Sequence, residues 1–276
     1  MNGADEATVV AAQTVPTFGA VDQNRSRTVE LVREHADADL VVLPELATTG
    51  YVFESRTELE TLAEPRDGPT AEAWAAVAAE TDAWVVGGFA EVDGNSYYNS
   101  SLVVSPDGVE GGYRKVHLWN EEKRWFEPGD ALPTFETPFG RLGVQICNDL
   151  WFSETTVTQA RAGVDLVAVP TNWVPGPSEG ERPAGWTMGV HQAVARANEN
   201  RVFLACADRA GLERATAFEG QSVIVDPDGH PLAGPAPTTG EHVLTADCDL
   251  ERARTKALTP RDDALADRRP DVYDLE

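Results

Sequence analysis

The sequence predicts an α/β fold in which two mixed β-sheets lie between layers of helices. Short apolar runs typical of buried strands, such as residues 39–45 and 164–171, alternate with helical segments such as residues 70–83. This alternation is typical of sheets that are covered by helices. Hairpin signals also occur, as at Pro106-Asp107-Gly108, and they favour mixed sheets over one parallel, doubly wound sheet.

In the first part of the chain, strands are expected at residues 7–13, 39–45 and 84–92. A helix over residues 22–38 has apolar residues at helical spacing, and Asp22 can serve as its N-cap. The second helix, residues 70–83, consists of strong helix formers. Residues 97–118 then read as two strands joined by the turn at Pro106-Asp107-Gly108.

The second part repeats the pattern, with helices expected near residues 153–162 and 184–199. Strands are expected at residues 141–147, 164–171, 201–208 and 222–229. Residues 241–249 lead to a last short helix from about Leu250. Because the chain has no repeat, low-complexity stretch or linker, residues 1–276 are predicted to form one domain. Its charged tail, from about residue 259, is expected to extend over the surface or over a partner.

The charge is strongly negative, with 46 acidic against 22 basic residues and a net charge of −24. Such a field repels nucleic acids and anionic membranes, so neither is an expected partner. It favours adaptation to high salt, although an ordinary acidic protein has the same composition. The sequence has no run of 18 apolar residues and no signal-peptide pattern at its start, which predicts a cytoplasmic protein.

The chain contains three cysteines, Cys147, Cys206 and Cys248, without the paired spacing of disulfides or zinc sites. Cys206 lies in an apolar run, and it and Cys248 are interpreted as small core residues. Cys147 ends a strand-like run, and polar residues and a helix start follow it. It could be a core residue, a metal ligand or a nucleophile. A metal site is disfavoured, because no second cysteine or histidine lies at ligand spacing. A nucleophile is favoured, because the helix start that follows Cys147 stabilises a thiolate.

Two other predicted strands end in a charged residue. Glu45 closes "LVVLPE" and Lys115 closes "GGYRK". Each taken alone is more simply a solvated residue at a strand end. A carboxylate, an ammonium and a thiol together, however, suit acyl transfer. The carboxylate can take the thiol proton, the thiolate can attack a carbonyl or nitrile carbon, and the ammonium can stabilise the oxyanion.

At these three places the chain resembles the nitrilase superfamily, the carbon–nitrogen hydrolases with a Glu-Lys-Cys triad. The matching motifs are "LVVLPELATTGYVF", "YRKVHLWNEEKRWFEPGD" and "LGVQICNDLWFSE", and "GVDLVAVPTNW", "ARANENRVFLACADRAGLE" and "GQSVIVDPDG" follow in the family's order. The resemblance covers residues 7–275 and is nearest to archaeal aliphatic nitrilases and amidases. It implies a four-layer αββα sandwich, a homodimer formed through the helices beside the nucleophile strand, and no metal or organic cofactor.

The same resemblance implies roles for individual residues. Glu45 would be the general base, Lys115 the oxyanion stabiliser and Cys147 the nucleophile. Glu122 would lie beside the lysine and help to position the substrate, and the backbone N–H of Asn148 would complete the oxyanion hole. The position of Asp149 is interpreted as structural, because it ties the tight turn after the nucleophile.

The residues that select the substrate are less defined. Aromatic side chains near the triad motifs are either core residues or the walls of an apolar pocket: Tyr51, Trp119, Trp151, Phe152 and Trp173. Relatives that act on carbamoyl-D-amino acids carry paired arginines where this chain has Leu150 and Trp151, which disfavours that substrate. Arg182 lies in a Gly/Pro-rich loop and could approach the pocket, but it reads more simply as a solvated residue.

The predicted function is hydrolysis of a non-peptide carbon–nitrogen bond in a small linear amide, through a cysteine thioester, with release of ammonia and a carboxylic acid. Two alternative activities are hydrolysis of small aliphatic nitriles and hydrolysis of N-carbamoyl amines. The non-enzymatic alternative is a scaffold or binding protein that has the same fold but no turnover.

Overall fold

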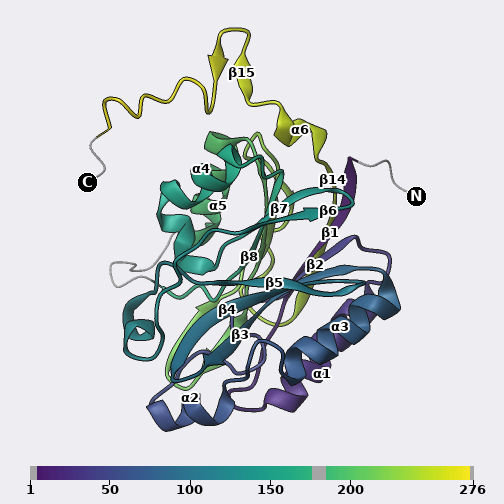
Figure 1. The fold of residues 1–276 in the computed structure, drawn as a ribbon, viewed down its shortest axis with the longest axis vertical. Helices are drawn as coiled ribbons and strands as arrows, with labels where there is room; N and C mark the ends of the chain where they lie inside the picture. Colours follow the sequence, from purple (N-terminus) through teal and green to yellow (C-terminus); the bar gives the residue numbers. More distant parts are fainter. Residues whose placement is uncertain (1–4, 176–184, 274–276) are drawn as a thin grey trace.

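Two six-stranded sheets form the centre of the computed structural model of the chain, which describes residues 5–175 and 185–273 (Figure 1). In the first sheet, β1, β2 and β3 are parallel, while β14, β4 and β5 are antiparallel to their neighbours. The strand order of this sheet is β14 (His242–Asp249), β1 (Glu6–Gln13), β2 (Leu40–Val42), β3 (Trp84–Asp93), β4 (Ser96–Ser105) and β5 (Gly108–Arg114).

The second sheet has the same plan, with three parallel strands, β7, β8 and β9, between antiparallel edges. Its strand order is β13 (Pro231–Ala233), β12 (Val223–Val225), β9 (Phe203–Ala207), β8 (Leu166–Pro170), β7 (Gly140–Val144) and β6 (Thr134–Thr137). Parallel strands with apolar residues on both faces need cover on both sides, which explains the nearly unbroken apolar runs in the sequence.

Successive side chains of each strand enter different layers, because a strand alternates its faces. In β1, Val9 and Ala11 pack between the two sheets, whereas Val10 and Ala12 pack under helices. The first sheet is covered by α1 (Val21–Glu34) and α3 (Pro69–Thr81), and the second by α4 (Ser153–Arg161) and α5 (Met188–Asn200). Figure 1 shows these helix pairs on opposite sides of the sheets. The predicted αββα sandwich is therefore confirmed.

Smaller elements complete the described part of the chain, and several had not been predicted. They are α2 (Arg56–Leu62), the hairpin of β10 (Ala210–Glu213) and β11 (Thr216–Glu219), α6 (Glu251–Arg254), the hairpin of β15 (Ala257–Thr259) and β16 (Asp262–Asp263), and the 3-10 turns η1 (Asn120–Arg124) and η2 (Cys147–Trp151).

Some boundaries differ from the prediction for local reasons. Asp22 does not cap α1, because the helix begins at Val21 and Asp22 lies in its first turn, where it pairs with Arg25. Strand β2 ends at Val42, shortly before Pro44, which has no N–H to donate to a neighbouring strand. The predicted helix start at Ala184 lies outside the described residues.

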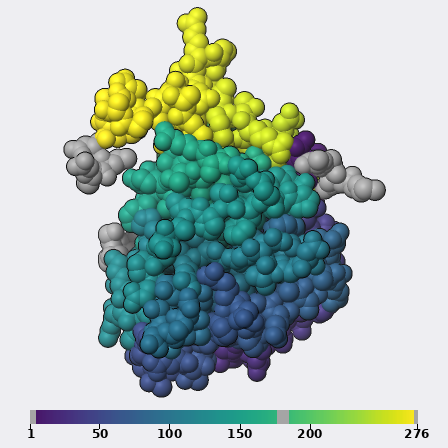
Figure 2. Space-filling view, in the orientation of Figure 1, coloured from purple at the N-terminus to yellow at the C-terminus, as the bar shows by residue number. Residues whose placement is uncertain are grey.

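The tail leaves the body of the molecule after α6, and Figure 2 shows its residues, in yellow, projecting from the rest of the surface. The segment predicted to be extended begins inside the β15–β16 hairpin. Leu265 packs against the core under the second sheet, and Arg268 donates to the carbonyl oxygen of Glu199 near the end of α5. Among the helices of the described residues, none has the length and apolar character needed to cross a bilayer.

We expect the stability of the protein to depend on salt. With a net charge of −24, carboxylates repel one another across the surface, and only 22 basic residues are available to offset them. The screening length falls from about 10 Å at 0.1 M salt to about 3 Å at 1 M, which removes most of this repulsion. The melting temperature should therefore rise with KCl, whereas the buried site chemistry should change much less.

Thermal melts and sedimentation between roughly 0.05 and 3 M KCl span these two screening regimes. Sodium chloride over the same range serves as a control for an ion-specific effect. A melting temperature that stays flat would rule out adaptation to high salt.

Candidate active site

Glu45, Lys115 and Cys147 meet between the ends of the two sheets. Glu45 follows β2 and Lys115 follows β5 in the first sheet, while Cys147 follows β7 in the second. The side chains of Glu45 and Lys115 are fully buried, and Cys147 is half-buried. Parallel strands bring their carboxyl ends to one edge of a sheet, so residues far apart in sequence come together there. The structure thus places near one another the three residues that the sequence analysis found at strand ends.

Lys115 is bound between two carboxylates. Its Nζ lies 2.6 Å from Oε1 of Glu45 and 2.7 Å from Oε1 of Glu122. Burial alone lowers the pKa of Lys115, but the charges of Glu122 and Glu45 outweigh it and raise that pKa above its usual value. Lys115 therefore keeps its positive charge, and its ammonium group is held in one place by two strong hydrogen bonds.

The two oxygens of Glu45 have different surroundings. Oε1 accepts hydrogen bonds from Lys115 and, at 2.6 Å, from the Nδ2 of Asn99. Oε2 is buried and has no hydrogen-bond partner. Burial raises the pKa of Glu45 to about 7, with Lys115 opposing this shift. Glu45 thus presents one free oxygen, and its pKa near 7 suits a general base.

Cys147 occupies a strained position at the start of η2. Its φ of 45° is unusual for a residue other than glycine, and such outliers often occur at functional sites. Burial and the charge of Glu45 raise the pKa of the Cys147 thiol. Lys115 and a hydrogen bond from the backbone N–H of Asn172 oppose that rise. The thiol therefore needs a base to become a thiolate, and Glu45 is the neighbouring group that can act as one.

Asp149 fixes the turn that carries Cys147. Its Oδ2 accepts hydrogen bonds from the backbone N–H of Ile146 at 2.8 Å and from the hydroxyl of Tyr113 at 2.7 Å. Its Oδ1 accepts from the backbone N–H of His117 and lies 2.9 Å from the Nδ1 of that residue. These contacts support the structural role that the sequence suggested for Asp149. They also occupy His117 with a structural contact.

A cavity of about 470 Å³ lies beside Glu122. Tyr51 lines it and donates a 2.5 Å hydrogen bond to Oε1 of Glu122, the same oxygen that binds Lys115. Most of the other lining residues are apolar or aromatic: Val52, Phe53, Trp119, Trp125, Phe126, Val174, Pro175, Ala215 and Ala217. Glu122 therefore connects the cavity to the triad, and this cavity is the candidate substrate pocket.

The structure does not bring all of the predicted pocket residues to this cavity. Trp151 is 57% exposed and Phe152 is 40% exposed, and Phe152 stacks on His117 at 3.9 Å between ring centroids. Trp173 is buried in the core between the second sheet and α5. The side chain of Asn148 donates to the backbone oxygen of His117, and Arg182 lies outside the described residues. Tyr51 and Trp119 are the predicted aromatic residues that do line the cavity.

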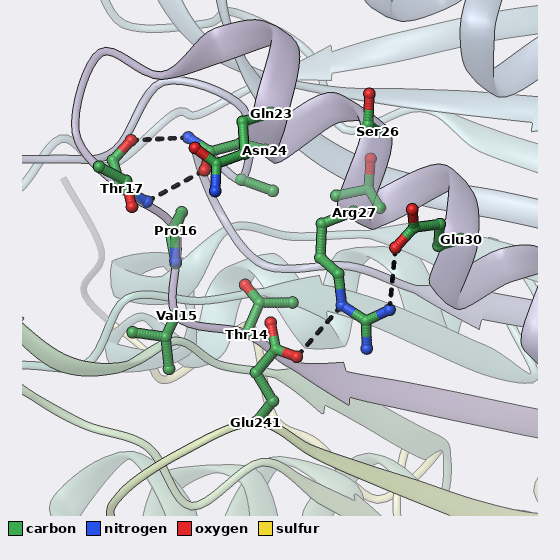
Figure 3. Close-up of a pocket in the computed structure, with 12 residues that line it drawn as sticks. Thr14, Val15, Pro16, Thr17, Gln23, Asn24, Ser26, Arg27, Glu30 and Glu241 are labelled. Atoms are coloured by element: carbon green, nitrogen blue, oxygen red, sulfur yellow. Dashed lines mark hydrogen bonds and ion pairs between the residues drawn. The ribbon is translucent and has the colours of Figure 1, made fainter.

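A second cavity, of about 540 Å³, lies between α1 and the end of β1 (Figure 3). Its charged groups are paired with one another, because Arg27 contacts both Glu30 and Glu241, as the dashed lines in Figure 3 show. None of the described residues that line it forms a hydrogen bond with Glu45 or Lys115. We therefore assign the chemistry to the cavity of about 470 Å³, because Glu122 lines that cavity and binds Lys115.

The carbon–nitrogen hydrolase family matches residues 7–257 of the chain. The chain belongs to this family. A nitrilase from Pyrococcus abyssi is 39% identical to this carbon–nitrogen hydrolase over 96% of the chain and 98% of the relative. An (R)-stereoselective amidase from a Pseudomonas species is 36% identical, over 91% and 87% of the two chains. Among solved structures, Nit3 of Saccharomyces cerevisiae, a member of the nitrilase superfamily, superposes with a TM-score of 0.78 at 26% identity, covering 90% of this chain and 92% of its own.

We expect the rate constant kcat/KM to rise with pH along a single ionisation with a midpoint near 7, because Glu45 must be ionised to accept the thiol proton. In the variant Asn99→Ala, the carboxylate of Glu45 loses a hydrogen bond that lowers its pKa. The midpoint should therefore move to higher pH in this variant. Steady-state kinetics between about pH 5 and 9 bracket this midpoint. An unchanged midpoint in Asn99→Ala would show that the ionisation of Glu45 does not cause the rise of kcat/KM with pH.

Proposed function

We propose that this carbon–nitrogen hydrolase cleaves small linear amides through a thioester on Cys147. The observation that carries the proposal is the buried cluster of Glu45, Lys115 and Glu122 at the half-buried Cys147. The cluster supplies a base with a free oxygen, a fixed ammonium group and a thiol, which are the three groups that acyl transfer needs.

In the first half of the reaction, the free Oε2 of Glu45 takes the proton of the Cys147 thiol. The thiolate then attacks the amide carbon, and the electron pair of the carbonyl bond moves to oxygen. The resulting oxyanion is stabilised by the ammonium group of Lys115 and the backbone N–H of Asn148, each worth roughly 3–4 kcal/mol in the transition state. The carbon–nitrogen bond breaks as Glu45 returns its proton to the nitrogen, so that ammonia leaves and a thioester remains.

In the second half, Glu45 takes a proton from a water molecule, which attacks the thioester carbon. The carbon–sulfur bond breaks, the carboxylic acid is released, and the thiolate recovers its proton from Glu45. In each half of the cycle Glu45 first accepts a proton and then donates it, so a pKa near 7 suits both halves. This scheme consumes one water molecule for each amide.

The lining of the candidate pocket favours an uncharged, apolar acyl group. Glu121 and Glu122 are its charged residues, and no arginine, lysine or histidine lines it in the described part of the chain. A substrate with a second carboxylate would be repelled there and would find no cation to bind. The positions of the paired arginines of carbamoyl-D-amino acid hydrolases also hold unsuitable residues, because Leu150 is buried in the core and Trp151 points outward.

Small aliphatic nitriles are the second candidate substrates, and the nitrilase relative at 39% identity favours them. The first step would be the same, with the thiolate attacking the nitrile carbon. The adduct would then need a proton on nitrogen, and a nitrile needs two water molecules to reach the acid. The same set of groups could serve both reactions, so the preference must be measured.

An ammonia-release screen tests these proposals. The substrates are propionamide and isobutyramide, their nitriles, N-carbamoyl-alanine, and succinamate as an amide with a second carboxylate. We expect the uncharged amides to react fastest and succinamate to react poorly. A preference for succinamate would overturn the proposed pocket chemistry, and in that case Arg182→Ala would test whether the loop arginine binds the carboxylate.

Intact-protein mass spectrometry after rapid acid quench tests the intermediate. We expect a mass increase of one acyl group in the protein with Cys147 and none in Cys147→Ala. If no substrate releases ammonia and no acyl-enzyme accumulates, the chain would be a silent scaffold of the same fold.

The oligomeric state is part of the proposal. Exposed apolar side chains lie at the starts of α4 and α5, among them Trp151, Phe152, Trp186 and Met188. Arg196 of α5 donates to the backbone oxygen of Trp151, so the two groups belong to elements in contact. Exposed apolar groups are typical of surfaces that become buried in a partner interface. We expect a homodimer through this face, and sedimentation at molar salt with the variant Trp151→Glu measures it. A wild-type monomer at micromolar concentration would contradict the expectation.

A further inference from the structure

Glu213, at the end of β10, binds the loop that carries Tyr51. Its Oε1 accepts hydrogen bonds from two successive backbone N–H groups, those of Tyr51 at 2.8 Å and Val52 at 2.6 Å. The Glu213 side chain is 4% exposed. Two donors on one carboxylate oxygen hold both peptide groups, and a charged acceptor makes each hydrogen bond stronger.

Arg209 holds Glu213 from the other side. Its Nη1 lies 2.5 Å from Oε2 of Glu213, and its Nη2 donates to the carbonyl oxygen of Pro16 at 3.2 Å. The guanidinium also lies 4.0 Å from the ring centroid of Phe218, and that ring packs edge-on against Tyr51. Arg209 is 1% exposed, so the pair is removed from solvent. Removing either partner would leave an uncompensated buried charge, which would destabilise the fold.

The loop backbone lies close to this ion pair. A Cβ atom at Gly50 would lie 2.6 Å from Oε2 of Glu213 and 2.9 Å from the Cα of Phe18. Gly50 also has a φ of +82°, which favours glycine. The chain therefore places a residue without a side chain where the loop meets the carboxylate.

The contacts continue from Tyr51 to the lysine of the triad. The Tyr51 hydroxyl lies 2.5 Å from Oε1 of Glu122, and the same oxygen lies 2.7 Å from Nζ of Lys115. Oε2 of Glu122 accepts from the backbone N–H of Trp119 at 3.1 Å. Polar contacts on either side of Tyr51, joined by the covalent frame of that residue, thus connect Arg209 to the ammonium group of Lys115.

We infer that Glu213, held by Arg209, is a positioning residue for Lys115 and acts through Tyr51 and Glu122. It touches no reacting atom in the proposed scheme, and the inference rests on the proposed function. The same pair anchors the β10–β11 hairpin, whose residues Ala215, Thr216 and Ala217 form one wall of the candidate pocket. One buried ion pair therefore aligns a pocket wall and the oxyanion-stabilising ammonium.

The variant Glu213→Gln tests the inference. Glutamine keeps the size of the side chain but replaces one oxygen by an NH₂ group, which would face either Arg209 or the two backbone donors. We expect kcat to fall by about tenfold to a hundredfold, since misplacing a catalytic group by about 1 Å costs up to that much. The value of KM should change less, because Lys115 acts mainly in the transition state.

The matched control is Arg214→Gln. Arg214 is the next residue of the same hairpin and pairs with Glu58 at 2.6 Å on the outer side, where it is partly exposed. This variant removes the ion pairs of Arg214 with Glu58 and Glu54, but it leaves the hydrogen bonds between Glu213 and the backbone of Tyr51 and Val52 in place. Its kcat should stay at the wild-type value. An equal loss in both variants would mean that the hairpin needs only general stability.

A double-mutant cycle with Tyr51→Phe separates positioning from stability. If Glu213 acts through the Tyr51 hydroxyl, Glu213→Gln should cost little more in the Tyr51→Phe background. Additive losses, or a lower melting temperature with unchanged kcat, would overturn the inference. If Glu213→Gln fails to fold, Arg209→Lys replaces it in the cycle and decides in the same way.

The cycle is also measured with alkylation of Cys147 by iodoacetamide, which needs no turnover. A wild-type protein that releases no ammonia from any amide would overturn the proposed function. Coupling between Glu213 and Tyr51 in the alkylation rate would still support the positioning role. Active wild-type protein with no coupling in either measurement would overturn the inference alone.

Discussion

Replacing Cys147 by alanine is expected to abolish ammonia release while the protein stays folded. The proposed reaction forms a covalent bond to the Cys147 sulfur, and alanine offers no atom that can replace it. Cys147 is half-buried at the start of a turn that Asp149 holds through backbone contacts, so losing the sulfur should leave the turn intact. The measurement is ammonia release at saturating amide, together with circular dichroism melts of both proteins.

Cys206→Ala is the matched control. Cys206 is fully buried in β9, in the core that the second sheet shares with α5. Its loss should cost about 1 kcal/mol of stability, as for other small core deletions, and should leave kcat nearly unchanged. Equal loss of activity in the two variants without unfolding would show that Cys147 is not the nucleophile.

The groups that sequence reasoning identified are those with a strong local signal. Glu45 and Cys147 each end an apolar, strand-like run, and Lys115 closes another predicted strand. The alternation of apolar runs and helical segments was also enough to predict the two sheets and their helix layers. Burial on both faces of a parallel sheet leaves a continuous apolar pattern in each strand.

The supporting residues were not identified, because their roles depend on tertiary contacts. Asn99 lies in a strand and bonds Glu45, which is 54 residues away. Glu213 contacts the backbone of Tyr51 across 162 residues. A glutamate or an asparagine at such a position reads as a polar surface residue until the fold buries it. For Arg209 and Glu213, the sequence feature that could have drawn attention to them is the motif "ARANENRVFLACADRAGLE", which contains both residues and is one of the motifs of the family resemblance.

The few lysines illustrate how the fold decides between roles. Lys115 is fully buried between two carboxylates, whereas Lys123 is exposed. Lys256 donates to the carbonyl oxygens of Asn200 and Arg201, where α5 ends, and a cation is favourable at such a place. Burial lowers the pKa of Lys256 to about 8. The structure thus distinguishes a lysine held between two carboxylates from a lysine bound at the end of a helix.

Replacing Lys115 by arginine should lower kcat by at least about a hundredfold, the effect of one missing oxyanion donor. The charge is kept, but a compact ammonium is replaced by a broad planar guanidinium. The native Nζ lies within 2.7 Å of two carboxylate oxygens in a fully buried site, so the larger group must displace Glu45, Glu122 or both. The oxyanion would then meet a donor in the wrong place.

The control for this prediction is Lys123→Arg, eight residues further along the chain, where the side chain is exposed and none of the described residues forms an ion pair with it. Melting temperatures and far-ultraviolet circular dichroism establish that both variants fold. Single-turnover kinetics with a small amide then compare the acylation rates, because the oxyanion forms in that step. Near-native acylation in Lys115→Arg would show that the site needs only a positive charge. In that case the two short contacts to Glu45 and Glu122 would serve to stabilise the fold, and another donor would have to hold the oxyanion.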